Sequence, residues 1–150
     1  MEQQRQTAGR DPLEGHAISS EMRTKMADWM IEVTSSFKCV DKTYYLALQI
    51  FDKYLIATRQ MGISMKDSDI HMVGMTSMYM ASKFHDVFPC HSTVVAQQIG
   101  HGLVSHKEII DEEEKYLKLF GFDINFATHY DFMEIFMQKI QFKIEQFFKF

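Results

Sequence analysis

The sequence has few of the residues that interrupt helices or cross-link small folds. Its 150 residues include only two prolines, Pro12 and Pro89, and two cysteines, Cys39 and Cys90. So few prolines allow long uninterrupted helices, and a single pair of cysteines excludes a small fold held by several disulfides. Because the chain starts without a secretory signal pattern, we expect both cysteines to stay as thiols in a reducing intracellular compartment.

Other features that are missing exclude several classes of function. No apolar run approaches the length of a membrane helix, and 16 Lys and Arg are outnumbered by 20 Asp and Glu, which disfavours nucleic-acid binding. There is no glycine-rich phosphate loop and no closely spaced set of metal ligands. Cys90 and His91 are adjacent, and neighbouring side chains rarely pair as nucleophile and base. We therefore expect a non-catalytic protein that binds another protein, without metal, cofactor or small-molecule substrate.

What is present is a set of apolar stripes at helical spacing. Hydrophobic residues make up 46% of the chain, with 13 Phe and 12 Met, which is enough for one compact domain. Apolar side chains recur at steps of three and four residues. Helices are expected over residues 18–37, 41–56, 67–84, 91–99 and 105–121. The polar residues 1–17 are expected to be a flexible lead-in, and residues 57–64 a polar break. The sequence therefore predicts an all-α fold.

Capping residues support these boundaries. Ser19 or Ser20 can cap the first helix and Asp41 the second. Ser105 and Glu108 have the spacing of a capping box, in which each side chain accepts a backbone N–H of the other residue. A short extended link, 122–126, is expected next, and Thr128 with Asp131 can cap the helix that follows it. The final helix should then carry an apolar face, including Phe132, Ile135, Phe136, Ile140 and Ile144, and further aromatic residues at Phe147, Phe148 and Phe150, which need a covering surface.

Two charges interrupt the apolar pattern. Lys83 ends the otherwise buried third helix, and Glu113 shares a face of the fifth helix with Ile109 and Leu117. Since an unpaired charge in a core is costly, each must reach the rim, pair, or serve a partner. The pattern alone favours a solvated position at the rim for both. Arg23 and Asp52 also adjoin apolar stripes, and there we expect an ion pair that fixes the packing of two helices.

Several segments resemble the cyclin family. The stretch Met22 to Val33 resembles the opening helix of a cyclin box, and Asp52-Lys53-Tyr54-Leu55 resembles the end of its second helix. Ala81-Ser82-Lys83-Phe84 and Phe122-Asp123-Ile124 continue the similarity, which is strongest to the A- and B-type mitotic cyclins. The resemblance implies a five-helix cyclin box over residues 18–121. It also implies that residues 122–150 are a linker and the first helix of a second, truncated box.

The resemblance also implies a function. Cyclins are regulatory subunits that bind and activate cyclin-dependent kinases in the cell cycle, in the nucleus and cytoplasm. In the family, the lysine of the Ser-Lys-Phe segment and a glutamate of the fifth helix bind backbone groups of the kinase, and these positions match Lys83 and Glu113. The apolar kinase contacts around them would be Phe84, Leu117, Phe122 and Ile124. The alternative is a cyclin-fold adaptor, of the transcription-factor or retinoblastoma kind, that does not activate a kinase.

A second family surface binds kinase substrates. The residues that match this docking patch are Met22, Met26, Trp29, Glu32 and His71. Lys25 stands where the family has isoleucine, and a cation there would disfavour basic docking peptides. The family's Lys-Phe-Glu-Glu is replaced here by Lys83-Phe84-His85-Asp86, which keeps one of the two acids. The segment Arg10 to Leu13 has the spacing of a destruction signal, and Arg23 and Asp52 match the family's internal ion pair.

Overall fold

The computed structural model describes residues 11–148, with backbone alone for 146–148. This part of the chain is helical, with a single isolated bridge between Ala17 and Lys66 and no β-strand, so the predicted all-α fold is confirmed. The helices are α2 (Ser20–Ser36), α3 (Asp41–Gln60), α4 (Ile70–His85), α5 (Ser92–Val94) with the π-helical turn η1 (Val95–Ile99), α6 (His106–Leu119) and α7 (His129–Phe148). Arg10, the start of the suggested destruction signal, and Phe150 lie outside the described residues.

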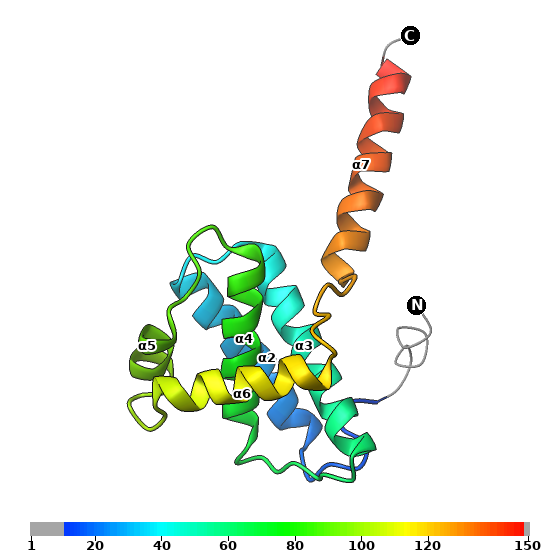
Figure 1. Cartoon of the computed structure of the whole chain (residues 1–150). Helices are drawn as coiled ribbons and strands as arrows, with labels where there is room; N and C mark the ends of the chain where they lie inside the picture. The colour runs from blue at the N-terminus through cyan, green and yellow to red at the C-terminus, as the bar shows by residue number, and fades with distance from the viewer. Residues whose placement is uncertain (1–10, 149–150) are drawn as a thin grey trace.

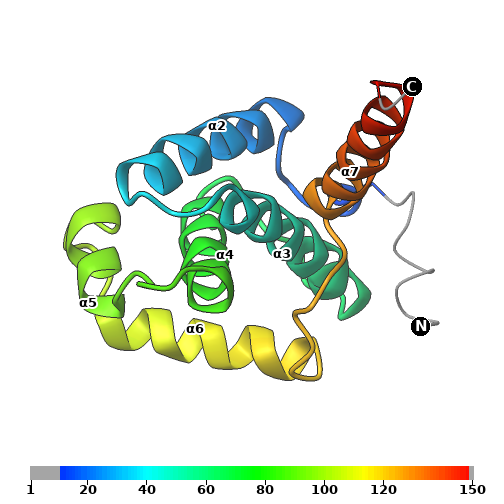
Figure 2. The same ribbon diagram turned by 90° about the horizontal axis from the view of Figure 1, so that it is seen from above.

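Helix α4 is the centre of the fold. Figures 1 and 2 show it enclosed by α2, α3, α5 and α6, and most of its residues are buried. This matches the sequence pattern, since a helix that is apolar nearly all round belongs in the middle of a bundle. Gly74 faces α2 at the crossing point, where an added Cβ would collide with the side chain of Met26 and crowd Met30. A glycine at this position therefore lets α2 and α4 pack closely.

The helix starts follow the capping residues in three of four cases. The side chain of Ser19 accepts the N–H of Met22 at 3.1 Å. Ser105 and Glu108 form the reciprocal capping box of α6, and Thr128 with Asp131 forms a similar exchange at the start of α7. The prediction for Asp41 was wrong: it is the first residue of α3 and makes no capping hydrogen bond. The N-cap residue is Val40. Its backbone N–H donates to the carboxylate of Asp86, the residue that follows α4.

Two predicted irregular segments are more ordered than expected. Helix α3 continues into the supposed polar break 57–64 and ends at Gln60. Thr58 is buried there, and its hydroxyl donates to the carbonyl oxygens of Tyr54 and Leu55. Residues 11–17 of the lead-in are anchored rather than free. The N–H of Met65 donates to Nδ1 of His16 at 3.0 Å, and Nε2 of His16 lies 2.7 Å from the carbonyl oxygen of Leu55. Tertiary hydrogen bonds therefore outweigh the polar local composition.

Helix α7 projects from the helical body (Figure 1), and its main contact among the described helices is with α3. An ion pair of 2.8 Å joins Lys42 to Glu134, and the side-chain amide of Gln49 donates to the carbonyl oxygen of Ala127. Its large apolar side chains are exposed, as the sequence predicts: Phe132, Met133, Ile135, Phe136, Met137, Ile140, Phe142 and Ile144. None of the described helices combines the length and the apolar character that crossing a bilayer requires.

Candidate functional site

The two anomalous charges meet at the surface. Nζ of Lys83, near the end of α4, lies 2.8 Å and 2.9 Å from the two carboxylate oxygens of Glu113 on α6. The Lys83 side chain is 44% exposed and that of Glu113 only 12%. Sequence reasoning placed both at the rim and did not predict that they pair with each other. The arrangement is an ion pair with one end in solvent and the other end set into the surface.

The protonation state of this pair follows from its surroundings. Partial burial disfavours the Lys83 ammonium, but the hydrogen bond and charge of Glu113 outweigh burial and raise the Lys83 pKa. The same ammonium lies 5.0 Å from the centre of the Tyr79 ring, a favourable distance for a cation–π contact. Lys83 is therefore a permanent cation at neutral pH, held in place from two sides.

The predicted apolar contacts are only partly exposed. Phe84 is 46% exposed beside the ion pair, whereas Leu117 and Ile124 pack partly against the core. Phe122 is 70% exposed, with a φ of 61° stabilised by a 2.7 Å hydrogen bond from its N–H to the carbonyl oxygen of Leu117. The structure thus presents Phe84 and Phe122 to solvent, and uses the other two predicted residues mainly to support the surface.

Sequence reasoning missed two exposed apolar residues in the loop that follows α4. Val87 is 85% exposed and Phe88 is 92% exposed. The available signal was a Val-Phe pair in a short link that ends at Pro89, where an apolar pair has no helical stripe to join. These two residues extend the apolar surface of Phe84 along the chain.

The residues of the predicted docking patch lie around the contact between α2 and α4. The rings of Trp29 and His71 lie 4.7 Å apart, and Nε2 of His71 lies 3.3 Å from the carbonyl oxygen of Ile99. Met26 is buried beneath them, Met22 is half-buried and packs against the core, and Glu32 is exposed on the same helix. The structure therefore brings Trp29 and His71 together.

The cation that stands in this patch has a local partner. Nζ of Lys25 lies 2.8 Å from Glu21, one helical turn earlier, and both side chains are well exposed. An exposed pair of this kind is weak and leaves the lysine free to move. Lys25 therefore reduces the apolar character of the patch without filling it.

Arg23 and Asp52 connect α2 to α3. Nε and Nη2 of Arg23 donate to the two oxygens of Asp52 at 2.8 Å and 2.6 Å. The hydrogen bond to Asp52 outweighs partial burial and raises the Arg23 pKa. The two side chains are about a quarter exposed, so this bidentate pair holds the orientation of α2, the helix that carries the docking patch.

Within residues 11–148, no group of three or more His, Cys, Asp or Glu side chains is arranged to hold a metal ion. A surface cleft of about 300 Å³ lies where α2, α3 and α7 meet, lined by Tyr44, Tyr45 and Tyr130 among others. It is open and mixed in character, and it holds no convergent acid–base pair.

Comparison with known proteins extends the resemblance seen in the sequence. Residues 1–125 match the family model "Cyclin, N-terminal domain". The chain is 33% identical over 120 residues to G2/mitotic-specific cyclin-B3 of Gallus gallus, 30% identical over 116 residues to the Mus musculus protein of the same name, and 28% identical over 122 residues to cyclin-A1 of Xenopus laevis. These alignments cover 79%, 77% and 81% of this chain, but only 28%, 8% and 28% of the relatives.

A solved structure shows the same fold. A viral cyclin from herpesvirus saimiri superposes with a TM-score of 0.63 at 19% sequence identity, over 72% of this chain and 44% of the viral protein. The family match spans most of the sequence, and the fold comparison agrees with it. This chain is therefore a member of the cyclin family.

Proposed function

We propose that this chain is a regulatory, non-catalytic subunit that binds and activates a cyclin-dependent kinase in cell-cycle control, as a mitotic cyclin does. The observation that carries the proposal is the Lys83–Glu113 pair beside exposed Phe84. The resemblance matches these residues to the positions at which the family contacts the kinase backbone, and their ion pair joins α4 to α6.

The pair is suited to binding backbone groups at an interface. An ammonium has three donors and a carboxylate about four acceptor sites, so each group can keep its partner and still bind a free helix-end carbonyl or N–H of the kinase. A pair that is already neutralised also loses less hydration energy on burial than either charge alone. Lys83 and Glu113 can therefore bind together as one unit.

Apolar contacts would surround this polar centre. Phe84 and Phe122 supply exposed aromatic rings, and Val87 and Phe88 lengthen the surface along the loop after α4. Aromatic side chains around a buried charged contact exclude water and carry much of the binding energy at interfaces. We further propose that a substrate peptide docks on the surface around Trp29, with weaker preference for basic peptides because of Lys25.

A pull-down against a panel of cyclin-dependent kinases tests the proposal, with histone kinase activity measured in the bound fraction. Truncation of Lys83 or Glu113 to alanine should weaken binding by about 2–5 kcal/mol, which raises Kd at least about thirtyfold. Matched controls are Glu114→Ala and Lys118→Ala, because these residues form an exposed ion pair on the same helix α6. Both controls should bind as the unchanged protein does.

The same experiment separates the alternative function. A folded, unchanged chain that captures no kinase from the panel would overturn the proposal and favour a cyclin-fold adaptor that does not activate a kinase. Equal loss of binding in the test and control variants would also contradict it, because the effect would then be one of general charge rather than of the Lys83–Glu113 contact.

A further inference from the structure

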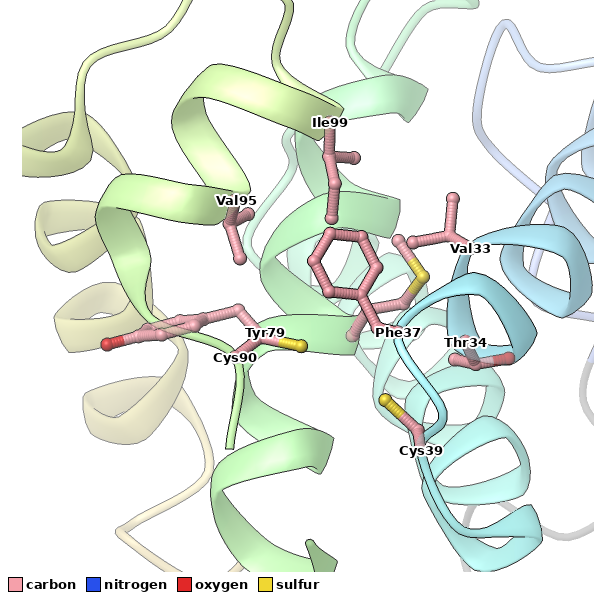
Figure 3. Close-up of a pocket in the computed structure, with 9 residues that line it drawn as sticks. Val33, Thr34, Phe37, Cys39, Tyr79, Cys90, Val95 and Ile99 are labelled. Carbon is pink, nitrogen blue, oxygen red and sulfur yellow. The ribbon is translucent and has the colours of Figure 1, made fainter. Parts of the chain in front are cut away.

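The two cysteines of the chain come together although they are far apart in the sequence. Cys39 lies in the loop between α2 and α3, and Cys90 in the loop between α4 and α5. Both line one small cavity of about 10 Å³. In Figure 3 their sulfur atoms turn toward each other across the space between the two loops, beneath Phe37. Both cysteine residues are partly exposed rather than buried in the core.

The surroundings of the two thiols differ. The N–H of Cys90 donates to Oγ of Ser82 at 2.9 Å, which leaves the hydroxyl hydrogen of Ser82 free to donate to the Cys90 sulfur. On the other side, one oxygen of Asp86 accepts the N–H of Val40 at 2.8 Å, while its second oxygen is buried without a hydrogen-bond partner. This carboxylate lies beside Cys39.

These neighbours assign different chemistry to the two sulfur atoms. Hydrogen bonding from the Cys39 thiol, and then from Ser82, lowers the pKa of Cys90 to about 6 despite partial burial. The pKa of Cys39 is raised far above its ordinary value by the adjacent Cys90 sulfur, by burial and by Asp86. A thiolate is therefore favoured on Cys90, which has the Ser82 hydroxyl as a donor, and disfavoured on Cys39, which lies beside the Asp86 carboxylate.

We propose that Cys39 and Cys90 form a redox-sensitive modification site, in which a hydroperoxide oxidises the pair to a reversible intramolecular disulfide. The nucleophile is the Cys90 thiolate, and the resolving thiol is that of Cys39. This site uses neither the Lys83–Glu113 pair nor the docking patch, so it stands independently of the proposed kinase binding.

The chemistry balances with one hydroperoxide as the two-electron oxidant. The Cys90 thiolate attacks the outer oxygen, the O–O bond breaks, and the departing alkoxide or hydroxide takes a proton to leave as an alcohol or water. Cys90 is then a sulfenic acid. The Cys39 sulfur attacks the Cys90 sulfur, the S–O bond breaks, and the Cys39 proton leaves with the hydroxyl as water. The Cys90 thiolate and the Cys39 thiol have together lost two electrons and one proton, and a thiol reductant reverses the change.

The disulfide would connect two loops that the reduced fold holds only by noncovalent contacts. The loop with Cys90 also carries Val87 and Phe88, the most exposed apolar residues near α4. Its partner loop leads directly into α3. Oxidation would therefore restrict the mobility of an apolar surface loop, and restricted loops exchange backbone amide hydrogens more slowly.

The test uses the full chain, purified with its thiols reduced and treated with hydrogen peroxide. Intact mass and maleimide labelling should show the loss of both thiols in a monomer, and peptide mapping should find Cys39 joined to Cys90. Dithiothreitol should restore both thiols. A monomer that keeps both thiols, or that forms disulfides only between chains, would overturn the proposal without any variant being needed.

Single substitutions test the two roles. In Cys39→Ser, peroxide should give a Cys90 sulfenic acid that dimedone traps and no intramolecular disulfide. Iodoacetamide should alkylate Cys90 in this variant faster than it alkylates Cys39 in Cys90→Ser at neutral pH, because only the thiolate reacts. Ser82 still favours a Cys90 thiolate in the first variant, and Asp86 still disfavours a Cys39 thiolate in the second. Equal alkylation rates in two folded variants would refute the assignment of nucleophile and resolving thiol.

Discussion

Lys83 and Glu113 are buried to different extents, so we expect truncation of each residue to lower the free energy of unfolding by a different amount. In Lys83→Ala the Glu113 carboxylate remains, only 12% exposed, with its cation removed. An unpaired charged group in such a place costs about 1–3 kcal/mol. In Glu113→Ala the Lys83 ammonium remains, but it is 44% exposed and can turn into water. The loss should then stay below about 1 kcal/mol, the value typical of an exposed pair.

The double variant Lys83→Ala/Glu113→Ala tests whether the unpaired carboxylate causes the loss of stability. Replacing both residues removes the stranded carboxylate as well as the pair, so the double variant should be more stable than Lys83→Ala alone. Urea unfolding followed by circular dichroism measures all four proteins, and an unchanged slope with denaturant shows that the unfolding transition is comparable. The differences are resolvable against the 5–15 kcal/mol stability of typical domains.

Two results would refute this reasoning. If Glu113→Ala were the more damaging single change, the burial argument would be wrong. If the two single effects simply added in the double variant, the pair would not be coupled in solution. Lys83→Arg is the matched control, because it keeps the positive charge and should retain most of the stability.

Three further predictions concern the helix cap, the interhelical ion pair and α7. Ser105→Ala should lower the unfolding free energy by about 1 kcal/mol. The backbone hydrogen bond from Ser105 lowers the Glu108 pKa, so this cap should weaken as pH falls below 4.5, the ordinary value; an amide NMR signal of Ser105 that does not titrate there would contradict this. Arg23→Ala should cost about 1–3 kcal/mol by leaving Asp52 unpaired, and Arg23→Lys should restore only part, since lysine cannot bind in the same bidentate way; full rescue in urea unfolding would be evidence against that geometry. Phe136→Ser should change the free energy of unfolding by less than about 0.5 kcal/mol, and so move the thermal midpoint little, because Phe136 is 63% exposed. It should also reduce binding of a hydrophobic dye; a large loss of stability would show that α7 is covered.

Local signals in the sequence predicted local structure well. The Ser105–Glu108 box lies within one turn, so its residues alone specify the start of α6. The apolar pattern of residues 70–84 likewise placed α4 at the centre. The apolar face of α7 could also be predicted, because the helical spacing of its apolar residues is a local feature of the sequence. The sequence showed no further apolar segment that could cover this face.

Contacts between distant elements could not be predicted in this way. Periodicity assigns Lys83 and Glu113 to helix faces, but it does not give the rotation of α4 against α6 that brings their side chains within 3 Å. For the same reason the sequence suggests for Asp86 only a role in binding a partner. In the structure, one of its oxygens accepts the backbone N–H of Val40, which lies 46 positions earlier in the chain. The lead-in around His16 looked flexible because its anchors lie on α3 and in the following loop.

The contact between Trp29 and His71 has a practical consequence. Trp29 is the single tryptophan of the chain, so the intrinsic fluorescence of the protein excited at long wavelength comes from one ring at the docking patch. That ring is partly exposed and stacks at a tilt on His71. A peptide that covers the patch would exclude water from the indole, and the emission maximum would move to shorter wavelength. Trp29 would therefore report the proposed peptide docking optically, without any label.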